Sequence, residues 1–319
     1  MLFSLLLVSP VTNASSPLTL TVTTDKPSYY VGEEVYICGN LTINDTAIQD
    51  ALVGLEVNNP ISVMIVRTRS TGTNLSQNWL IEVLNVTPCD QYGNPKDSFT
   101  KKILAYFKAT VKNNDIEMRN VLVTVNIYDV SRCPLGVASF EGTIKENTTV
   151  NIIMSIPIPQ TAETGNATAY ANAYSSWPRI GGKPYCPEKS EQFNITNGTP
   201  KTAPEPEEQT IQGNYNTTFK LSFAEPLGTY TIHVSSIYQG LPAINETTFE
   251  VKVLGDANGD GRVGTVDLSM LGQAWDTSQA DPNNELLGTV WNANCDFDAD
   301  LKIGTSDLSI MGRYWGYKT

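Results

Sequence analysis

The chain of 319 residues contains one histidine, His233, and carries 21 basic side chains against 33 acidic ones. The net charge of −12 argues against nucleic acid or an anionic membrane as a partner, because both are polyanions. Serine and cysteine triads need a histidine, and alternation with Ile232 and Val234 places His233 on the polar face of a strand. We therefore expect a solvated His233 and a non-catalytic protein. Paired carboxylates for glycoside hydrolysis stay open, because a sequence does not show their separation.

Long hydrophobic runs are also missing. The run Leu2–Val8 is too short to cross a bilayer and is typical of the apolar core of a secretory signal, with Ala14 and Ser15 near a cleavage point. We expect residues 1–14 to be a signal peptide, and the protein to be secreted and associated with the cell surface. The alternative is that this run forms a first β-strand. No later run is long and apolar enough to predict a membrane span.

Asn-X-Ser/Thr sequons are numerous, and such a sequon accepts a glycan only in an exported protein. All of them precede residue 250: Asn13, Asn40, Asn44, Asn74, Asn85, Asn147, Asn166, Asn194, Asn197, Asn216 and Asn245. We expect glycosylation at those after Asn13. The alternative is a β-protein rich in threonine and asparagine, in which sequons arise incidentally.

Cysteine is scarce, with five in the chain. Four of them precede the acidic C-terminal segment: Cys38, Cys89, Cys133 and Cys186. None has a CxxC or other metal-ligand spacing, so disulfides are favoured over a zinc site, and three pairings are open. The fifth, Cys295, is expected to be a free thiol or a small buried side chain.

Residues 17–253 are rich in strand-forming residues. Runs of valine, isoleucine, threonine and tyrosine alternate with clusters of glycine, proline, asparagine and aspartate. In one such run a single face is apolar, which is the period of a half-buried strand: Val121, Val123, Val125 and Ile127. Many short strands at this spacing predict a mostly β fold made of immunoglobulin-like β-sandwiches.

The order of the strands predicts that one sandwich is inserted in another. Residues 25–42 resemble the opening strands of the macroglobulin-like, immunoglobulin-like sandwiches of bacterial and archaeal surface proteins, and residues 213–253 resemble their closing strands. We therefore expect a discontinuous sandwich from residues 17–78 and 207–253, with a second sandwich at 80–200. Two or three sandwiches in series are the alternative.

The stretch GDANGDGRVGTVDL, residues 255–268, concentrates oxygen ligands. Calcium accepts six to eight oxygens, and an EF-hand loop supplies them from positions 1, 3, 5, 7, 9 and 12, with glycine at position 6. The first loop fits this pattern with Asp256, Asn258, Asp260, the carbonyl of Arg262, and Asp267. Residues 254–319 contain ten acidic and four basic side chains, a net charge of −6, which suits a cation site.

The same pattern returns 40 residues later. Its ligands are Asp296, Asp298, Asp300, the carbonyl of Lys302, and Asp307. Each loop runs into apolar residues at helical spacing: Leu268, Leu271 and Trp275 after the first, and Leu308, Met311 and Trp315 after the second. One loop–helix unit cannot bury its apolar stripe alone, so we expect the two helices to pack as a small α-helical pair. The two ligand patterns predict two calcium ions.

The doubled unit at residues 254–319 resembles a type I dockerin in its GDxNGDG opening, the aspartate at position 12 and the DL at each helix start. The resemblance implies calcium-dependent binding to a cohesin domain of a partner protein. By position it implies these partner-binding residues: Thr265, Val266, Gln273, Thr305, Ser306 and Arg313. Leu301 departs from the pattern, because it replaces the glycine of position 6. We expect a strained backbone or an altered turn there, and weaker calcium binding at the second site.

Two functions follow from these features. The first is a secreted, non-catalytic surface or assembly protein that docks through its dockerin-like end. The alternative is a carbohydrate-binding or polysaccharide-degrading component of a cellulosome-like complex. In that case exposed aromatic side chains would stack on sugar rings, and the candidates are Trp79, Tyr170, Tyr174 and Trp177.

Overall fold

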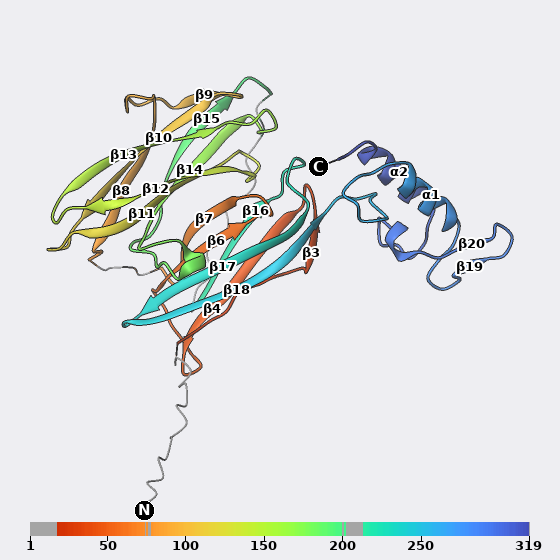
Figure 1. The fold of residues 1–319 in the computed structure, drawn as a ribbon, viewed down its shortest axis with the longest axis horizontal. Helices are drawn as coiled ribbons and strands as arrows, with labels where there is room; N and C mark the ends of the chain where they lie inside the picture. The colour runs from red at the N-terminus through yellow and green to blue at the C-terminus, as the bar shows by residue number, and fades with distance from the viewer. Residues whose placement is uncertain (1–17, 74, 76–77, 200, 202–212, 319) are drawn as a thin grey trace, which may run out of the picture.

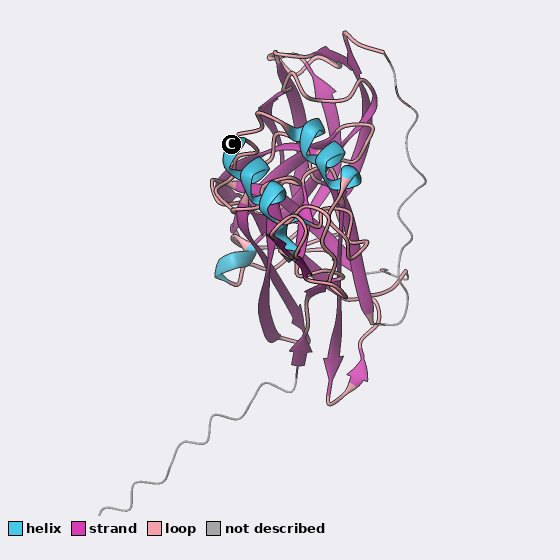
Figure 2. Cartoon of the chain, turned by 90° about the vertical axis from the view of Figure 1, so that its right-hand side faces the viewer, coloured by secondary structure: helices cyan, strands magenta, loops and turns pink. Residues whose placement is uncertain are grey.

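The computed structural model describes residues 18–73, 75, 78–199, 201 and 213–318. The expected signal peptide at residues 1–14 lies outside this part of the chain. The protein is mostly β, with several sheets and two short helices near the C-terminus (Figure 1). In Figure 2 the two helices lie next to each other, in front of the strand layers.

Strands from both ends of the β region form the first pair of sheets. One sheet has the order β1–β4–β16, with β2 and β5 also paired to β4. Its strands are β1 (Leu18–Leu20), β2 (Thr23–Thr24), β4 (Glu34–Ile43), β5 (Thr46–Ala47) and β16 (Asn214–Lys220). The other has the order β3–β18–β17–β6–β7. Its strands are β3 (Ser28–Tyr30), β6 (Leu52–Asn58), β7 (Val63–Ser70), β17 (Gly228–Tyr238) and β18 (Leu241–Lys252).

The chain between these two groups of strands forms a second pair of sheets, with the orders β13–β10–β8 and β12–β11–β14–β15–β9. The first consists of β8 (Ile81–Cys89), β10 (Leu104–Asn113) and β13 (Thr149–Pro157). The second consists of β9 (Ser98–Thr100), β11 (Arg119–Tyr128), β12 (Pro134–Ile144), β14 (Gly165–Tyr174) and β15 (Lys189–Thr196). Three rings meet at the centre of the core between these sheets: Phe99, Phe107 and Phe193.

The first pair of sheets shows the expected alternation in β17. Tyr230, Ile232 and Val234 are fully buried in one core. His233 lies on the opposite face, where its Nδ1 is 3.1 Å from Oε2 of Glu246 on β18. Its side chain is 18% exposed, so this histidine is partly covered by its strand neighbours.

Strand β11 is buried on both faces, although its sequence predicts burial of only one. The predicted apolar face lies in the core of the second pair of sheets. The opposite face is buried as well, and its residues are Leu122, Thr124, Asn126 and Tyr128. Asn126 on this face is covered by Val66: its Oδ1 accepts the N–H of Val66 at 2.6 Å, and its Nδ2 donates to the carbonyl of Val66 at 2.5 Å. Val66 belongs to β7, so the two pairs of sheets pack against each other here.

Arg67 of β7 is central to this contact. Its guanidinium donates to the two carboxylate oxygens of Glu188 at 2.8 and 2.7 Å, and Arg69 reaches the same carboxylate at 3.2 Å. The guanidinium carbon of Arg67 also lies 3.6 Å from the ring centroid of Tyr170. Burial alone would raise the pKa of Glu188, but the charge and hydrogen bonds of Arg67, with the charge of Arg69, lower that pKa below its usual value.

A second ion pair joins the two pairs of sheets. Glu56 of β6 is fully buried, and its Oε1 accepts a hydrogen bond from Nη1 of Arg179 at 2.5 Å. Arg179 belongs to the short 3-10 helix η1 (Pro178–Ile180), which follows β14. Two charged contacts between residues distant in sequence therefore fix one pair of sheets on the other.

The expectation of disulfides is wrong. All five cysteines lie in the described residues, and all five are free. They are spread over separate elements: Cys38 in β4, Cys89 at the end of β8, Cys133 before β12, Cys186 before β15, and Cys295 in the C-terminal part. Burial raises the pKa of the Cys133 thiol to about 12 and that of Cys186 to about 11, so both behave as small buried side chains.

The C-terminal part contains α1 (Thr265–Gln273), β19 (Asn283–Asn284), β20 (Thr289–Val290), the 3-10 turn η2 (Ala293–Cys295) and α2 (Thr305–Tyr314). Its buried apolar residues belong to the same cluster as the core of the first pair of sheets, and they are Ala257, Val263, Leu271, Ala274, Cys295, Ile303 and Met311. Only the middle residue of each predicted helical stripe is buried, whereas Leu268, Leu308 and Trp315 are exposed. The helices span only nine and ten residues. Met270, Trp275 and Tyr314 are partly buried and pack against the core beside Leu271 and Met311. Neither helix is long and apolar enough to cross a membrane, and no other described helix is.

We predict that Glu188→Gln lowers the free energy of unfolding by about 3 kcal/mol, because it leaves the buried guanidinium of Arg67 without its counter-ion. Urea unfolding at neutral pH measures the loss. The folded-state pKa of Glu188 lies below its usual 4.5. The carboxylate therefore contributes its full stabilisation above that pH, and the contribution is lost as the pH falls through the folded-state pKa. The two proteins should thus converge in stability in acid.

Glu163→Gln is the matched control. Glu163 pairs with Lys201 at 2.7 Å, but the two side chains are 37% and 55% exposed, so solvent screens the pair. We expect little change in the unfolding midpoint of this variant. Equal losses in Glu188→Gln and Glu163→Gln would contradict a central role for the buried pair.

Candidate metal centre

Each acidic loop ends on an aspartate that caps the helix after it. Asp267 and Asp307 are the third residues of α1 and α2, and their Oδ2 atoms accept the N–H of the glycine three residues earlier at 2.8 Å. Their Oδ1 atoms accept the N–H of the second loop residue, Ala257 at 2.9 Å and Phe297 at 2.7 Å. Both carboxylates are buried, and the helix N-terminus stabilises their charge. The last ligand position therefore closes each loop onto its start.

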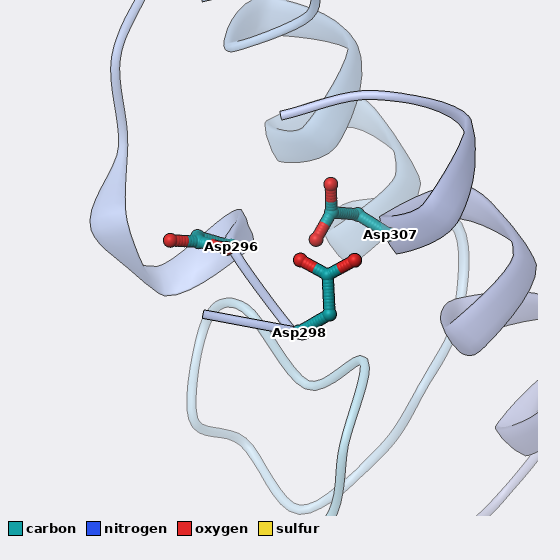
Figure 3. A group of neighbouring side chains, drawn as sticks. All are labelled: Asp296, Asp298 and Asp307. Atoms are coloured by element: carbon teal, nitrogen blue, oxygen red, sulfur yellow. The ribbon is translucent and has the colours of Figure 1, made fainter. Parts of the chain in front are cut away.

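Three carboxylates of the second loop converge (Figure 3). One oxygen each of Asp296, Asp298 and Asp307 lies within 4.8 Å of the others. In Figure 3 the carboxylates of Asp298 and Asp307 point toward each other, and Asp296 lies beside them. The Oδ1 atom of Asp296 is buried and accepts no hydrogen bond from the described residues. Three converging carboxylates, one with a buried oxygen that lacks a donor, can hold a metal ion.

The electrostatics of this group favour a cation. Burial raises the pKa of Asp296, and the charges of Asp307, Asp300 and Asp298 raise it further, although the N–H of Leu301 at 3.1 Å partly offsets these effects. A bound divalent cation would replace this mutual repulsion with attraction. Asp300 is not among the converging carboxylates, and its Oδ1 accepts the N–H of the residue two positions on at 2.8 Å.

The first loop satisfies its acids with internal hydrogen bonds. Asp256 accepts the N–H groups of residues 259–261 at 2.8 to 3.1 Å. The side-chain amide of Asn258 donates to the carboxylate of Asp260 at 3.0 Å. Within the described residues, Asp256, Asp260 and Asp267 do not form a second converging group. One loop therefore presents a group that could hold a metal ion. That this ion is calcium, and that the first loop holds another, stay predictions.

The backbone of the second loop is strained where the sequence predicts it. Leu301 has a φ of 67°, in the left-handed region that its counterpart Gly261 adopts with a φ of 81°. Ala299 has a φ of 58° opposite Gly259, whose φ is 74°, although the ligand pattern alone does not single this residue out. A residue with a Cβ costs on the order of 1 kcal/mol in this region. The second loop thus contains two strained residues where the first has two glycines.

The two loop–helix units are interlocked by short backbone pairings. The residue at position 8 of each loop pairs with the chain that leaves the helix of the other unit. Val263 exchanges N–H···O bonds of 3.0 and 2.9 Å with residues 316–317, and Ile303 exchanges bonds of 2.9 and 3.0 Å with residues 276–277. Neither loop is complete without the other unit. Sequence repetition predicts two packed helices, but it does not predict this crossing of the backbone.

Comparison with known proteins places the fold only broadly. No family model matches the chain, and no curated protein matches it. Among solved structures, the C-terminal domain of Wzt is 10% identical, with 38% of this chain and 77% of that domain covered and a TM-score of 0.32. A CARDB domain from Pyrococcus furiosus, in complex with di-metal ions, is 12% identical, with 39% and 97% covered and a TM-score of 0.26. A β-glucosidase from Listeria innocua is 8% identical, with 46% and 18% covered and a TM-score of 0.26.

The chain is a mostly β protein with distant similarity to β-sandwich domains. At these TM-scores the similarity says nothing of its activity.

The side chains with an implied role in partner binding are all exposed: Thr265, Val266, Gln273, Thr305, Ser306 and Arg313. The two residues at each helix start directly precede the buried capping aspartate, so the closed loop fixes their backbone. Val266 is 55% exposed, and the neighbouring Leu268 and Leu308 add further apolar surface. Whether these residues contact a partner stays a prediction.

Both loops face the first pair of sheets. A hollow of about 550 Å³ separates them from β3 and β18, and acids of both loops, including Asp256 and Asp296, line it. Tyr30 lies on the opposite wall. Burial raises the pKa of Tyr30, and the charges of Glu33 and Asp296 raise it further. The loops therefore point toward the first pair of sheets, whereas the helix starts are open to solvent.

The four aromatic candidates for sugar stacking occupy different environments. Tyr174 is fully buried, and Tyr170 is covered by the guanidinium of Arg67, so neither offers a free ring. Trp177 is half-buried, and its Nε1 donates to Glu141 at 2.6 Å. Trp79 is half-buried at the entrance to β8. The two tyrosines are covered where the two pairs of sheets meet, so they are no longer candidates for sugar stacking. The sequence does not reveal this burial.

The predicted glycosylation sites also divide by exposure. Asn216 is buried and Asn40 is half-buried, so the folded protein shields both. Asn74 and Asn13 lie outside the described residues. The exposed sequons are Asn44, Asn85, Asn147, Asn166, Asn194, Asn197 and Asn245. Their modification stays a prediction.

We predict that Leu301→Gly stabilises the C-terminal part by about 1 kcal/mol, because glycine adopts a positive φ without a Cβ clash. The side chain of Leu301 is 53% exposed, so its loss removes little buried surface. Thermal unfolding in calcium and calcium titration followed by calorimetry measure the change, and we expect tighter binding as well.

Lys302→Gly is the matched control for this variant. Lys302 is the next residue and has no positive φ, so glycine there only increases the freedom of the unfolded chain. We expect Lys302→Gly to be mildly destabilising. A lower unfolding temperature for both glycine variants would show that the positive φ of Leu301 does not destabilise the loop.

Proposed function

We propose that residues 254–319 form a calcium-binding docking module of the dockerin kind, which attaches a secreted, non-catalytic β-sandwich protein to a partner with a cohesin domain. The observation that carries the proposal is the converging group of Asp296, Asp298 and Asp307 in the second of two repeated loops. Its ligands are all oxygens, which suits a hard cation. Calcium is favoured over magnesium, because the repeated loop pattern offers side-chain and carbonyl oxygens at several positions and calcium accepts six to eight oxygen ligands.

In this proposal two calcium ions hold the module together. The first ion would be bound by Asp256, Asn258, Asp260, the carbonyl of Arg262, and Asp267. The second would be bound by Asp296, Asp298, Asp300, the carbonyl of Lys302, and Asp307. The ions do not touch the partner. They neutralise the loop acids, so that the interlocked backbone keeps both helix starts in place for the cohesin.

The first test concerns folding. We predict that backbone amides of residues 254–319 in the full chain are protected from hydrogen exchange in calcium and lose that protection in excess chelator. The reason is that binding energy becomes folding energy when the ligands must be assembled, and calcium at 100 times its Kd stabilises by about 2.7 kcal/mol. The amides of both pairs of sheets serve as the internal reference and should not change.

Two substitutions sharpen this test. Asp307→Asn removes one of the converging carboxylates and should abolish the calcium-dependent protection. Asp281→Asn changes an exposed aspartate outside both loops and should leave it intact. Protection that persists in chelator would contradict a calcium-dependent fold.

The second test concerns the partner. We predict that the full chain captures a cohesin-bearing protein from the secreted and surface fractions of its source organism in calcium, and not in chelator. Mass spectrometry identifies the captured protein. The double variant with Thr265→Arg and Thr305→Arg should abolish capture, because it places bulk and charge on both exposed helix starts.

Thr248→Arg makes the same change at an exposed position of β18, outside the module, and should capture normally. An empty capture by a chain whose calcium-dependent protection has been measured would mean that the loops form an internal structural element. The docking proposal would then be wrong, while the metal site would stand.

A further inference from the structure

A hollow of about 740 Å³ opens where the chain crosses from the first pair of sheets to the second. We call it the junction pocket. Its walls are the start of β6, the end of β17, the segment that enters β8, and the loop between β14 and β15. The volume falls in the range of small-molecule binding sites, about 300–1,000 Å³.

Three aromatic side chains from three of these walls line the junction pocket: Trp79, Tyr185 and Tyr238. Each is half-buried, so packing holds the ring while part of its surface stays accessible. Trp79 and Tyr185 pack on the core of the second pair of sheets, and Tyr238 packs on the core of the first. The hydroxyl of Tyr185 donates to the carbonyl of Asn120 at 3.1 Å, which fixes the far end of that ring. The rings therefore form a preorganised surface.

The polar lining of the junction pocket has balanced charge. One carboxylate, Asp50, and one ammonium group, Lys183, contribute opposite charges, so the lining gives no net attraction for an ion. Ser175 and Gln239 add neutral hydrogen-bonding groups. This combination of flat apolar rings and neutral or balanced polar groups matches a ligand with C–H faces and hydroxyl edges.

Two residues with a positive φ border the pocket from different walls, Asp50 with 60° and Gln239 with 49°. Gln239 and Gly240 form the two-residue turn between β17 and β18, where a positive φ at both residues is usual. The hairpin turn therefore fixes the backbone of this wall.

We propose that the junction pocket binds a neutral oligosaccharide, with pyranose rings stacked on Trp79, Tyr185 and Tyr238 and hydroxyl groups bonded to the polar lining. The proposal does not rest on the docking module. It assigns the ligand site to the boundary between the two pairs of sheets, which the ion pairs of Arg67 and Glu56 hold in one arrangement.

Calorimetric titration of the full chain in calcium tests the proposal with four neutral probes, cellohexaose, maltohexaose, xylohexaose and mannohexaose. We expect at least one to bind. Trp79→Ala and Tyr238→Ala should each weaken that binding about tenfold, since each removes one stacking surface. Trp177→Ala, which removes a half-buried tryptophan outside the pocket, should leave the affinity unchanged.

Folding and charge are controlled separately. Thermal unfolding shows whether Trp79→Ala stays folded, and Trp79→Phe, which keeps a ring, should retain most of the affinity. Failure of all four probes to bind, or binding that survives both alanine variants, would overturn the proposal. So would a preference for oligogalacturonate that Lys183→Gln abolishes, because the ligand would then be an anion. None of these results affects the calcium-dependent capture of a partner.

Discussion

A buried carboxylate needs a positive partner, and this constraint organises both junctions of the chain. Between the two pairs of sheets, Glu188 is desolvated and is neutralised by Arg67 and Arg69. At the C-terminal part, Asp267 and Asp307 are buried at helix starts with backbone N–H groups as their partners. The difference is that protein groups complete the first neutralisation. In the second loop the described residues do not, and the buried Oδ1 of Asp296 accepts no hydrogen bond from them.

Sequence patterns predicted the elements whose burial is local. Alternation in β17 and β11 located the core-facing residues, because a strand points every second side chain to the same side. The repeat at 40 residues predicted two loops that each lead into a helix, and Leu301 was expected to distort its turn. In both cases the cause lies within a few residues of the effect, so a short window of sequence contains it.

Contacts between distant residues could not be predicted in this way. Arg67 and Glu188 are charged, and charged residues are usually exposed, so nothing in the local pattern marks them as an interface. The same interface buries Tyr174 and the polar face of β11. The disulfide expectation failed for a related reason, since cysteine count says nothing about which strands lie together. Convergence of three acids in only the second loop depends on hydrogen bonds that the repeated ligand pattern does not encode.

The location of the two proposed sites follows from one strand. β17 begins at Gly228, which borders the hollow under the metal loops, and ends at Tyr238, which lines the junction pocket. Its residues rise about 3.3 Å each, so the two ends are separated by about 33 Å. β17 is hydrogen-bonded to β18 on one side and to β6 on the other, so it is an inner strand of its sheet. An inner strand paired on both sides holds its two ends at a fixed separation. The strand therefore sets the distance between the proposed docking module and the proposed ligand site.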